Sequence, residues 1–133
     1  MADGYAILNI DDVDSVAEAN GMTFGEARFV RDQVGAEQVG LAHYRFKPGK
    51  RLGFGHHHDT VEEFYVVLEG TGRVKIDDDI RDLRTLDVVR VAPTAMREFE
   101  AGDDGMVLLA MGDHAKGQSH MDPSFWPEGD PAS

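Results

Sequence analysis

The length and the charge of this chain limit what it can be. Its 133 residues suit one domain, with a core large enough to fold without disulfides or a structural metal. Twenty-five acidic residues against thirteen basic ones give a net charge of -12, which argues against a nucleic-acid partner and against docking to an anionic membrane. Because cysteine is absent, any bound metal must be held by nitrogen and oxygen ligands.

From the first residues we expect neither a leader nor an anchor. The stretch MADGYAILNIDD lacks a basic region followed by a long apolar run, and no segment approaches the roughly eighteen apolar residues of a membrane span. We therefore expect a cytoplasmic protein. Residues 11–20 then predict a short N-terminal helix, with Asp12 as its cap and Gly21 at its end.

From residue 26 onward the pattern changes to short runs of β-prone residues separated by turn residues. The runs cover residues 27–34, 38–46, 63–68, 73–76, 80–83, 88–91, 97–101 and 106–111. Turn sequences such as Pro48-Gly49 and Gly70-Thr71-Gly72 divide them. Many short strands with frequent turns predict an all-β fold, either a sandwich or a closed barrel.

Several of these runs are apolar on both faces, most clearly Phe64-Tyr65-Val66-Val67-Leu68. One face must line the barrel, and the other needs cover from a second sheet, the N-terminal segment or a partner subunit. We expect a homodimer that associates through sheet edges or the N-terminal strand.

The C-terminal end of the chain is rich in proline and polar residues. We predict one domain over residues 1–115 and a tail over residues 116–133. Two alternatives remain for Phe125 and Trp126, which either clip this tail to the body of the protein or lie in a mobile terminus.

The residues that suggest chemistry lie between positions 55 and 63. In an extended chain, residues two apart share a face, so His56 and His58 point together while His57 points toward solvent or an interface. Glu63, at the start of the next run, can join the pair. Two imidazoles and a carboxylate predict a site for a divalent transition metal (Zn, Mn, Fe or Ni) with positions left open for a ligand. The alternative is a metal-free pocket in which these side chains form hydrogen bonds.

The spacing His56-x-His58-x4-Glu63-x6-Gly70 resembles the first sequence motif of the cupin superfamily. Residues 48–112 are similar to the single-domain "cupin 2" conserved barrel proteins. The resemblance implies a double-stranded jelly-roll barrel with a metal or a small-molecule ligand inside it.

The chain departs from the second motif of that family. There the motif reads Gly-x5-Pro-x-Gly-x2-His-x3-Asn, and its histidine is the usual fourth metal ligand. The signature positions fall here on Leu86, Ala92, Thr94, Arg97 and Ala101. A shift by one residue would place Glu98 at the histidine position. Strand alternation favours Arg97, which shares a face with Phe99, and predicts that Glu98 and Glu100 lie in water.

An arginine inside the barrel alters the electrostatics of the site, because its side chain stays charged. Arg97 either pairs with Glu63 in place of a metal or lies beside a three-ligand metal and holds an anionic ligand. Tyr65, which shares a face with Glu63, is predicted to contact the ligand, and Tyr44 and Phe99 to form an apolar wall.

Two classes of function remain open from the sequence. The first is a metal-dependent enzyme that acts on a small polar or anionic substrate by isomerase, lyase or dioxygenase chemistry. The second is a non-catalytic protein whose pocket holds a small carboxylate or sugar. The implied fold hosts both. We expect His43 to be a satisfied histidine on the outer face of its strand and not a ligand.

Overall fold

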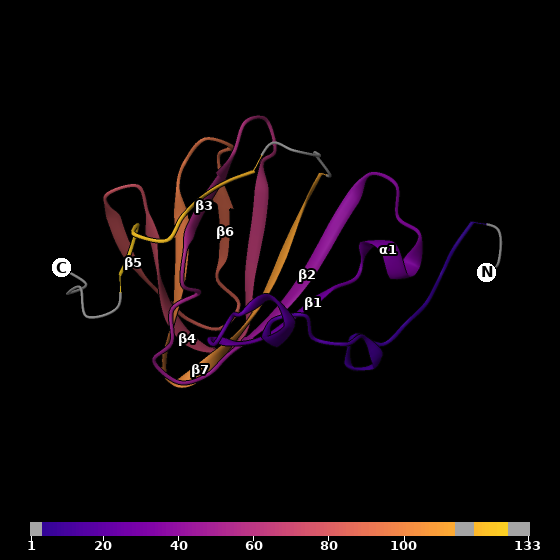
Figure 1. Cartoon of the computed structure of the whole chain (residues 1–133), viewed down its shortest axis with the longest axis horizontal. Coiled ribbons are helices and arrows are strands. Elements are labelled where there is room, and N and C mark those ends of the chain that lie inside the picture. Colours follow the sequence, from indigo (N-terminus) through magenta and orange to yellow (C-terminus); the bar gives the residue numbers. More distant parts are fainter. Residues whose placement is uncertain (1–3, 114–118, 128–133) are drawn as a thin grey trace.

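The strands form one antiparallel sheet of eight strands that curls into a barrel (Figure 1). The computed structural model describes residues 4–113 and 119–127. Its strands are β1 (Gly25–Phe29), β2 (Val39–Phe46), β3 (Gly55–His58), β4 (Glu63–Ile76), β5 (Asp79–Leu83), β6 (Val88–Val91), β7 (Arg97–Asp113) and β8 (Ser119–Asp122). The expected all-β jelly roll is therefore confirmed. No helix in these two ranges is long and apolar enough to cross a membrane.

Two long strands, β4 and β7, run through both layers of the barrel. One layer has the order β1-β2-β7-β4-β6, built on residues 63–70 of β4 and 106–113 of β7. The other has the order β8-β3-β7-β4-β5, built on the opposite halves of the same two strands. The pairing shifts between Gly70 and Gly72, where the sheet bends. Gly70 has a φ of 76°, and a Cβ there would lie 2.2 Å from the carbonyl oxygen of Gly105, so this bend requires glycine.

Alternating residues of these strands fill the barrel. Ala42, Ala110 and Tyr65 lie opposite one another on neighbouring strands, and all three side chains are buried. The outward neighbours Phe64 and Val88 keep 44% and 62% of their surface exposed. The period-two reading of the sequence is thus confirmed for the strands that carry the site.

The N-terminal helix predicted for residues 11–20 is wrong. The segment forms two short 3-10 turns, Ile10–Asp12 and Glu18–Asn20. Between these turns the chain follows the edge of β1, where the Val16 amide donates to the Ala27 carbonyl and the Arg28 side chain donates to the Val13 carbonyl. These tertiary hydrogen bonds override a weak helical preference.

The α-helix α1 (Arg31–Val34) lies within residues predicted as strand. The run 27–34 is therefore strand only as far as Phe29. Gly35, in the left-handed conformation, ends the helix and donates its amide to the carbonyls of Arg31 and Asp32.

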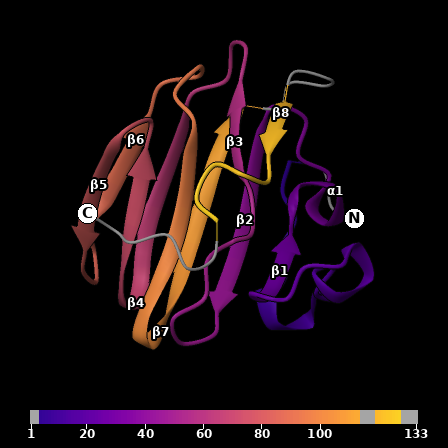
Figure 2. The ribbon, with the colours of Figure 1, turned by 60° about the vertical axis from the view of Figure 1, so that its left-hand side comes forward.

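The segment predicted as a tail contributes to the barrel. Residues Ser119–Asp122 form β8, which pairs with β3 so that His57 lies opposite His120 (Figure 2). Beyond it the side chain of Trp126 is only 2% exposed. A Cβ on Gly55 would lie 2.5 Å from the Phe125 ring, so Gly55 gives this segment room to pack against β3. Of the two alternatives, the first is correct: Phe125 and Trp126 pack against the body of the protein.

Candidate metal centre

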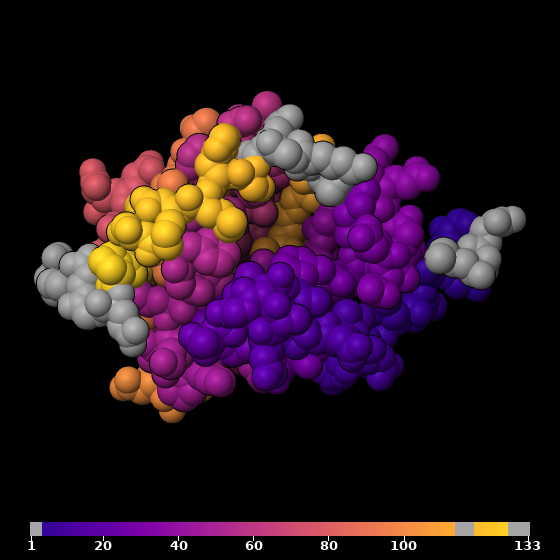
Figure 3. Space-filling view, viewed as in Figure 1, coloured from indigo at the N-terminus to yellow at the C-terminus, as the bar shows by residue number. Residues whose placement is uncertain are grey.

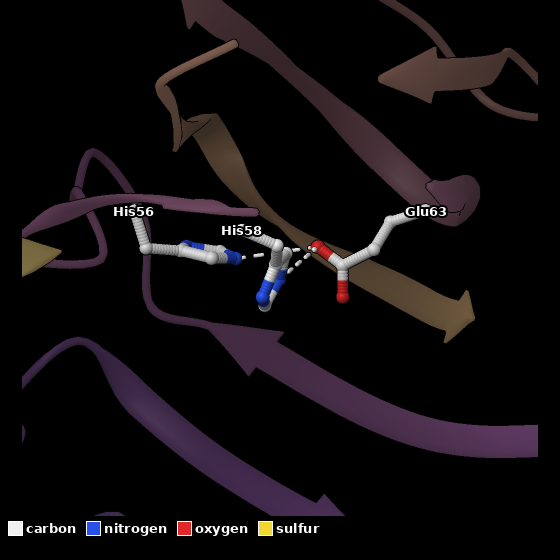
Figure 4. A group of neighbouring side chains, drawn as sticks. All are labelled: His56, His58 and Glu63. Carbon is white, nitrogen blue, oxygen red and sulfur yellow. Dashed lines mark hydrogen bonds and ion pairs between the residues drawn. The ribbon is translucent and has the colours of Figure 1, made fainter. Parts of the chain in front are cut away.

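Three side chains converge inside the barrel, two from β3 and one from the start of β4 (Figure 4). His56 Nε2 lies 3.3 Å from Glu63 Oε1, and His58 Nε2 lies 3.2 Å from the same oxygen. One ligand atom from each residue falls within 4.8 Å of the others. All three side chains are less than 20% exposed, with values of 19%, 13% and 18%. The predicted convergence of these residues is confirmed.

The two distances from the histidine nitrogens to the carboxylate oxygen fit a first-row divalent metal. With metal–ligand bonds of about 2.1 Å, neighbouring ligand atoms are about 3.0 Å apart at right angles and about 3.4 Å apart in a tetrahedron. Both histidine-to-carboxylate distances, 3.3 and 3.2 Å, lie in that interval. Among the described residues no well-formed hydrogen bond reaches the buried His58 Nε2, which leaves its lone pair available to an ion.

The protonation states suit metal binding. Burial by itself raises the pKa of Glu63, but hydrogen bonds from His56 and Tyr65 and the two nearby imidazoles outweigh burial and hold that pKa at about 2. Burial lowers the pKa of His58. The site therefore offers an ionised carboxylate and a neutral imidazole, the forms that bind metals.

The C-terminal strand orients His58. The Oγ of Ser119 lies 2.9 Å from His58 Nδ1, and the His58 amide donates to the Pro93 carbonyl at 2.8 Å. With Nδ1 engaged by the hydroxyl, Nε2 turns toward Glu63. Sequence reasoning missed Ser119, because it lies 61 residues from His58 and carries no motif of its own.

Arg97 lies inside the barrel, on the face that strand alternation predicts. Its side chain is completely buried, and its two terminal nitrogens donate to the carbonyls of His56 and Ala92 at 3.1 and 3.2 Å. Nη2 also lies 3.9 Å from Glu63 Oε1. Arg97 thus supports the backbone behind the centre and contributes a positive charge near the carboxylate.

The prediction that Glu98 and Glu100 lie in water is wrong. Glu98 is 1% exposed, and the side chain of Glu100 is 13% exposed and bonded to Arg51 and Arg73. Both residues do point away from the barrel interior. The segment around Trp126 covers this outer face, and alternation along a single strand carries no information about such a cover.

The aromatic residues predicted for the ligand site lie at different depths. The Tyr65 hydroxyl donates to Glu63, and its ring lies 4.5 Å from that of Phe99, with both side chains 2% exposed. Tyr44 lines a cavity beside the cluster. Burial, reinforced by the Glu63 carboxylate, raises the pKa of both tyrosines, so their hydroxyls remain hydrogen-bond donors. Ligand contact stays a prediction for all four residues, Arg97, Tyr65, Tyr44 and Phe99.

The neighbouring histidines lie outside the cluster. His57 stacks on His120 with ring centroids 4.8 Å apart, and His120 Nε2 lies 2.9 Å from Asp59. His43 lies on the outer face of β2, as expected, but it is buried, and its Nδ1 has no hydrogen-bond partner within residues 4–113 and 119–127. The expectation of a satisfied His43 is therefore wrong, although His43 does not join the metal cluster.

A cavity of about 740 Å³ opens next to the metal centre, with His58 and Glu63 in its wall. It is bounded by the N-terminal segment, α1, β2, the end of β7 and Ser119. The space-filling view looks into a hollow between the indigo N-terminal residues and the yellow C-terminal residues (Figure 3). A small molecule in this cavity would therefore lie beside the three candidate ligands.

The sequence of the chain matches one protein family, and its fold matches several solved structures. Residues 42–112 match the family model described as Cupin domain. A cupin protein from Bacteroides fragilis is 20% identical with a TM-score of 0.70, and the alignment covers 87% of this chain and 89% of that one. A polyketide cyclase from Streptomyces resistomycificus is 16% identical with a TM-score of 0.74, covering 92% and 87%.

An oxalate decarboxylase from Bacillus subtilis is 20% identical with a TM-score of 0.71 over 85% of this chain. The chain spans 31% of the length of that protein. No curated protein matches the sequence. At these identities the solved structures show a common fold and no common activity.

Proposed function

The chain belongs to the cupin family, and from that premise we propose that it binds a small molecule beside a divalent metal ion held by His56, His58 and Glu63. The observation that carries the proposal is the convergence of His56 Nε2 and His58 Nε2 on one ionised carboxylate oxygen of Glu63, at 3.3 and 3.2 Å. Two imidazole nitrogens and a carboxylate oxygen this close together form a donor set that a divalent transition metal binds.

The three ligands would leave part of the coordination sphere of an ion open. When bound, a metal of the Zn, Mn, Fe or Ni type acts as a Lewis acid on an oxygen donor of the ligand. The residues of the chain hold the ion at the wall of the cavity, and Tyr65 keeps Glu63 in place through its hydroxyl. We propose isomerase or lyase chemistry, with dioxygenase chemistry if the metal is iron.

The metal-free alternative has weaker support. Arg97 and Glu63 are 3.9 Å apart, which is a loose ion pair. Arg97 is completely buried, donates to two backbone carbonyls and does not line the cavity. It therefore has little capacity to hold an anionic ligand, as that alternative requires.

Metal binding tests the proposal directly. Protein purified without an affinity tag should contain close to one transition-metal ion per chain by elemental analysis. In a calorimetric titration of the metal-free chain with Mn²⁺ or Zn²⁺, His58→Ala should weaken binding by more than the 10- to 100-fold that loss of an outer-sphere partner typically causes, or roughly 100-fold and above. The matched control is His57→Ala, on the same strand but stacked on His120.

Two results would contradict the proposal. The first is an absence of metal binding at millimolar ion concentration in folded protein. The second is an equal loss of affinity in the His57 and His58 variants, which would mean that the ion binds elsewhere on the histidine-rich strand.

The homodimer and the cytoplasmic location stay proposals. The exposed apolar side chains Phe64 and Val88, on the outer face of neighbouring strands, support self-association. Light scattering at micromolar concentration should give the mass of a dimer. A monomer mass would contradict self-association and leave the fold assignment unchanged.

A further inference from the structure

We propose that the cavity beside the metal centre selects an uncharged or cationic ligand with an apolar body, and that it discriminates against small anions. The proposal rests on the proposed function, because it takes the cavity as the ligand site. It differs from the expectation of a polar or anionic substrate that the sequence suggested. Three features of the cavity support it: its wall, its rim and its inner end.

Apolar side chains form about half of the cavity wall. Phe29, Tyr44, Val61 and Ala110 lie along it, together with Val16 and Met111. The volume of about 740 Å³ falls within the roughly 300–1,000 Å³ of small-molecule sites. A ligand with an apolar body would gain contact with these side chains, whereas a small polyanion would leave them unused.

The rim of the cavity is acidic. Asp12 and Asp14 come from the N-terminal segment, Asp32 from α1 and Asp113 from the end of β7, and all four are exposed. Since these four aspartates come from three separate parts of the chain, their common position results from the fold. A concave entrance with charges of one sign repels ligands of that sign and attracts the opposite sign.

Cations do little to offset these aspartates. Among the described residues that line the cavity, Arg31 is the one arginine or lysine. Its Nη1 lies 3.0 Å from Asp32 Oδ1, and its Nη2 donates to the Glu37 carbonyl at 3.2 Å. The charge of Arg31 is thus already paired with an acidic group of the same rim.

The inner end of the cavity adds a further negative charge. Glu63 lines the cavity as a carboxylate, whereas Arg97 behind it is completely buried and absent from the lining. An anion entering the metal-free cavity would therefore meet negative charge at the rim and at the inner end. A metal ion would offer one attractive point there, suited to a single oxygen donor.

The charge preference can be measured with three probes of one shape. The metal-free full-length chain is titrated by calorimetry at low salt with 2-naphthalenemethanol, 2-naphthylmethylammonium and 2-naphthoate. We expect the alcohol and the ammonium ion to bind at least about tenfold more tightly than the carboxylate, with the difference shrinking at high salt. Equal or tighter binding of the carboxylate, or no binding of any probe at millimolar concentration, would overturn the proposal.

A matched pair of variants separates the rim from the net charge. The rim variant carries Asp12→Asn, Asp14→Asn and Asp113→Asn, and leaves the Arg31–Asp32 pair intact. The control carries Asp78→Asn, Asp103→Asn and Asp104→Asn, which are exposed and do not line this cavity. The rim variant should reduce the tenfold preference to about threefold or less, and the control should retain it. An equal reduction in both would assign the preference to net charge and overturn the role of the rim.

The same titrations separate this proposal from the metal-site proposal. Charge selection is measured without metal, and metal affinity is measured without probe. If the chain binds no metal but prefers the alcohol, the metal proposal fails and the charge selection stands. If the chain binds metal but prefers 2-naphthoate in the metal-free state, the charge selection fails and the metal proposal stands.

Discussion

Glu63 lies inside the barrel and Glu98 lies on its outer face, and both are shielded from solvent. Their pKa values nevertheless shift in opposite directions. Hydrogen bonds from His56 and Tyr65 hold the pKa of Glu63 at about 2 in spite of its burial. Burial raises the pKa of Glu98 to about 7, and one hydrogen bond from the Gly53 amide offsets that effect only in part. The partners around a buried carboxylate, more than burial itself, decide whether it is ready to bind a cation.

The two surroundings also differ in how their polar groups are paired. On the outer face, Trp126 is buried under the Arg51 guanidinium, 4.2 Å from the ring centre, and Glu100 bonds to both Arg51 and Arg73. Lys75 Nζ donates to the Phe125 carbonyl at 2.8 Å. We call these residues, Arg51, Arg73, Lys75, Glu100 and Trp126, the C-terminal clamp. The clamp joins two arginines to one carboxylate and stacks a cation on an indole ring, as expected of a stabilising contact, whereas the metal centre gathers two imidazoles around one carboxylate.

The largest expected effect is the loss of the clamp. Trp126→Ala should lower the free energy of unfolding by about 3 to 5 kcal/mol, because it removes a large buried side chain. Urea unfolding followed by circular dichroism measures this. The control is Met121→Ala, a position on β8 that is 68% exposed, which should change stability by less than about 0.5 kcal/mol. A similarly small change in the Trp126 variant would show that the clamp adds no stability.

The pH dependence of stability tests the state of Glu98. Its pKa rises from 4.5 to about 7 on folding, so the folded chain binds more protons between these values and loses stability as the pH rises through them. A shift of this size corresponds to at most about 3 kcal/mol. Glu98→Gln should remove this loss, so the metal-free variant should gain stability over the natural chain between pH 4.5 and 7. A pH-independent difference would mean that the pKa of Glu98 does not change on folding.

The metal centre can be changed at Arg97, which the motif resemblance places at the position of the family's fourth ligand. Arg97→His replaces a fixed charge near Glu63 with a neutral imidazole, and both changes should tighten Zn²⁺ or Mn²⁺ binding by about tenfold, or 1.4 kcal/mol. Titration of the variant measures this, with circular dichroism to confirm its fold and Arg90→His as the exposed control. Unchanged or weaker affinity in a folded variant would show that Arg97 does not border the ion.

A smaller effect is expected at Ser119, which connects the two regions through β8. Ser119→Ala removes the hydroxyl from His58 Nδ1 and should weaken metal binding by up to about tenfold, the lower end of the range for an outer-sphere partner, because this contact is exposed to solvent. Ser119→Thr should restore it, and Ser124→Ala, farther along the same segment, should have no effect. If Ser119→Ala leaves the affinity unchanged, His58 does not depend on this contact for its orientation.

Alternation and spacing predicted the parts of the site that lie close together along the chain. His56 and His58 share a face of one strand, and Glu63 begins the next, so local geometry is sufficient to bring them together. The inward position of Arg97 followed from the same rule. The short turns likewise indicated the all-β fold.

What the sequence did not predict depends on contacts between distant residues. Glu98 was placed in water because alternation gives the side of a strand but not what covers that side. Ser119 was assigned to a tail because β8 has four residues and pairs only with β3. The helix expected over residues 11–20 is absent because the edge of β1 takes the hydrogen bonds of that segment.

The pairing of β8 with β3 has a consequence for the order of folding. Ser119 and His58 are 61 residues apart, so their contact closes a long loop, and loop closure slows the formation of such pairings. Because β3 and β8 also have only four residues each, we expect the strand that carries two candidate metal ligands to gain this outer neighbour late in folding. We expect metal uptake during refolding to lag behind the burial of the core, which would make the ion a reporter of the last stage of assembly.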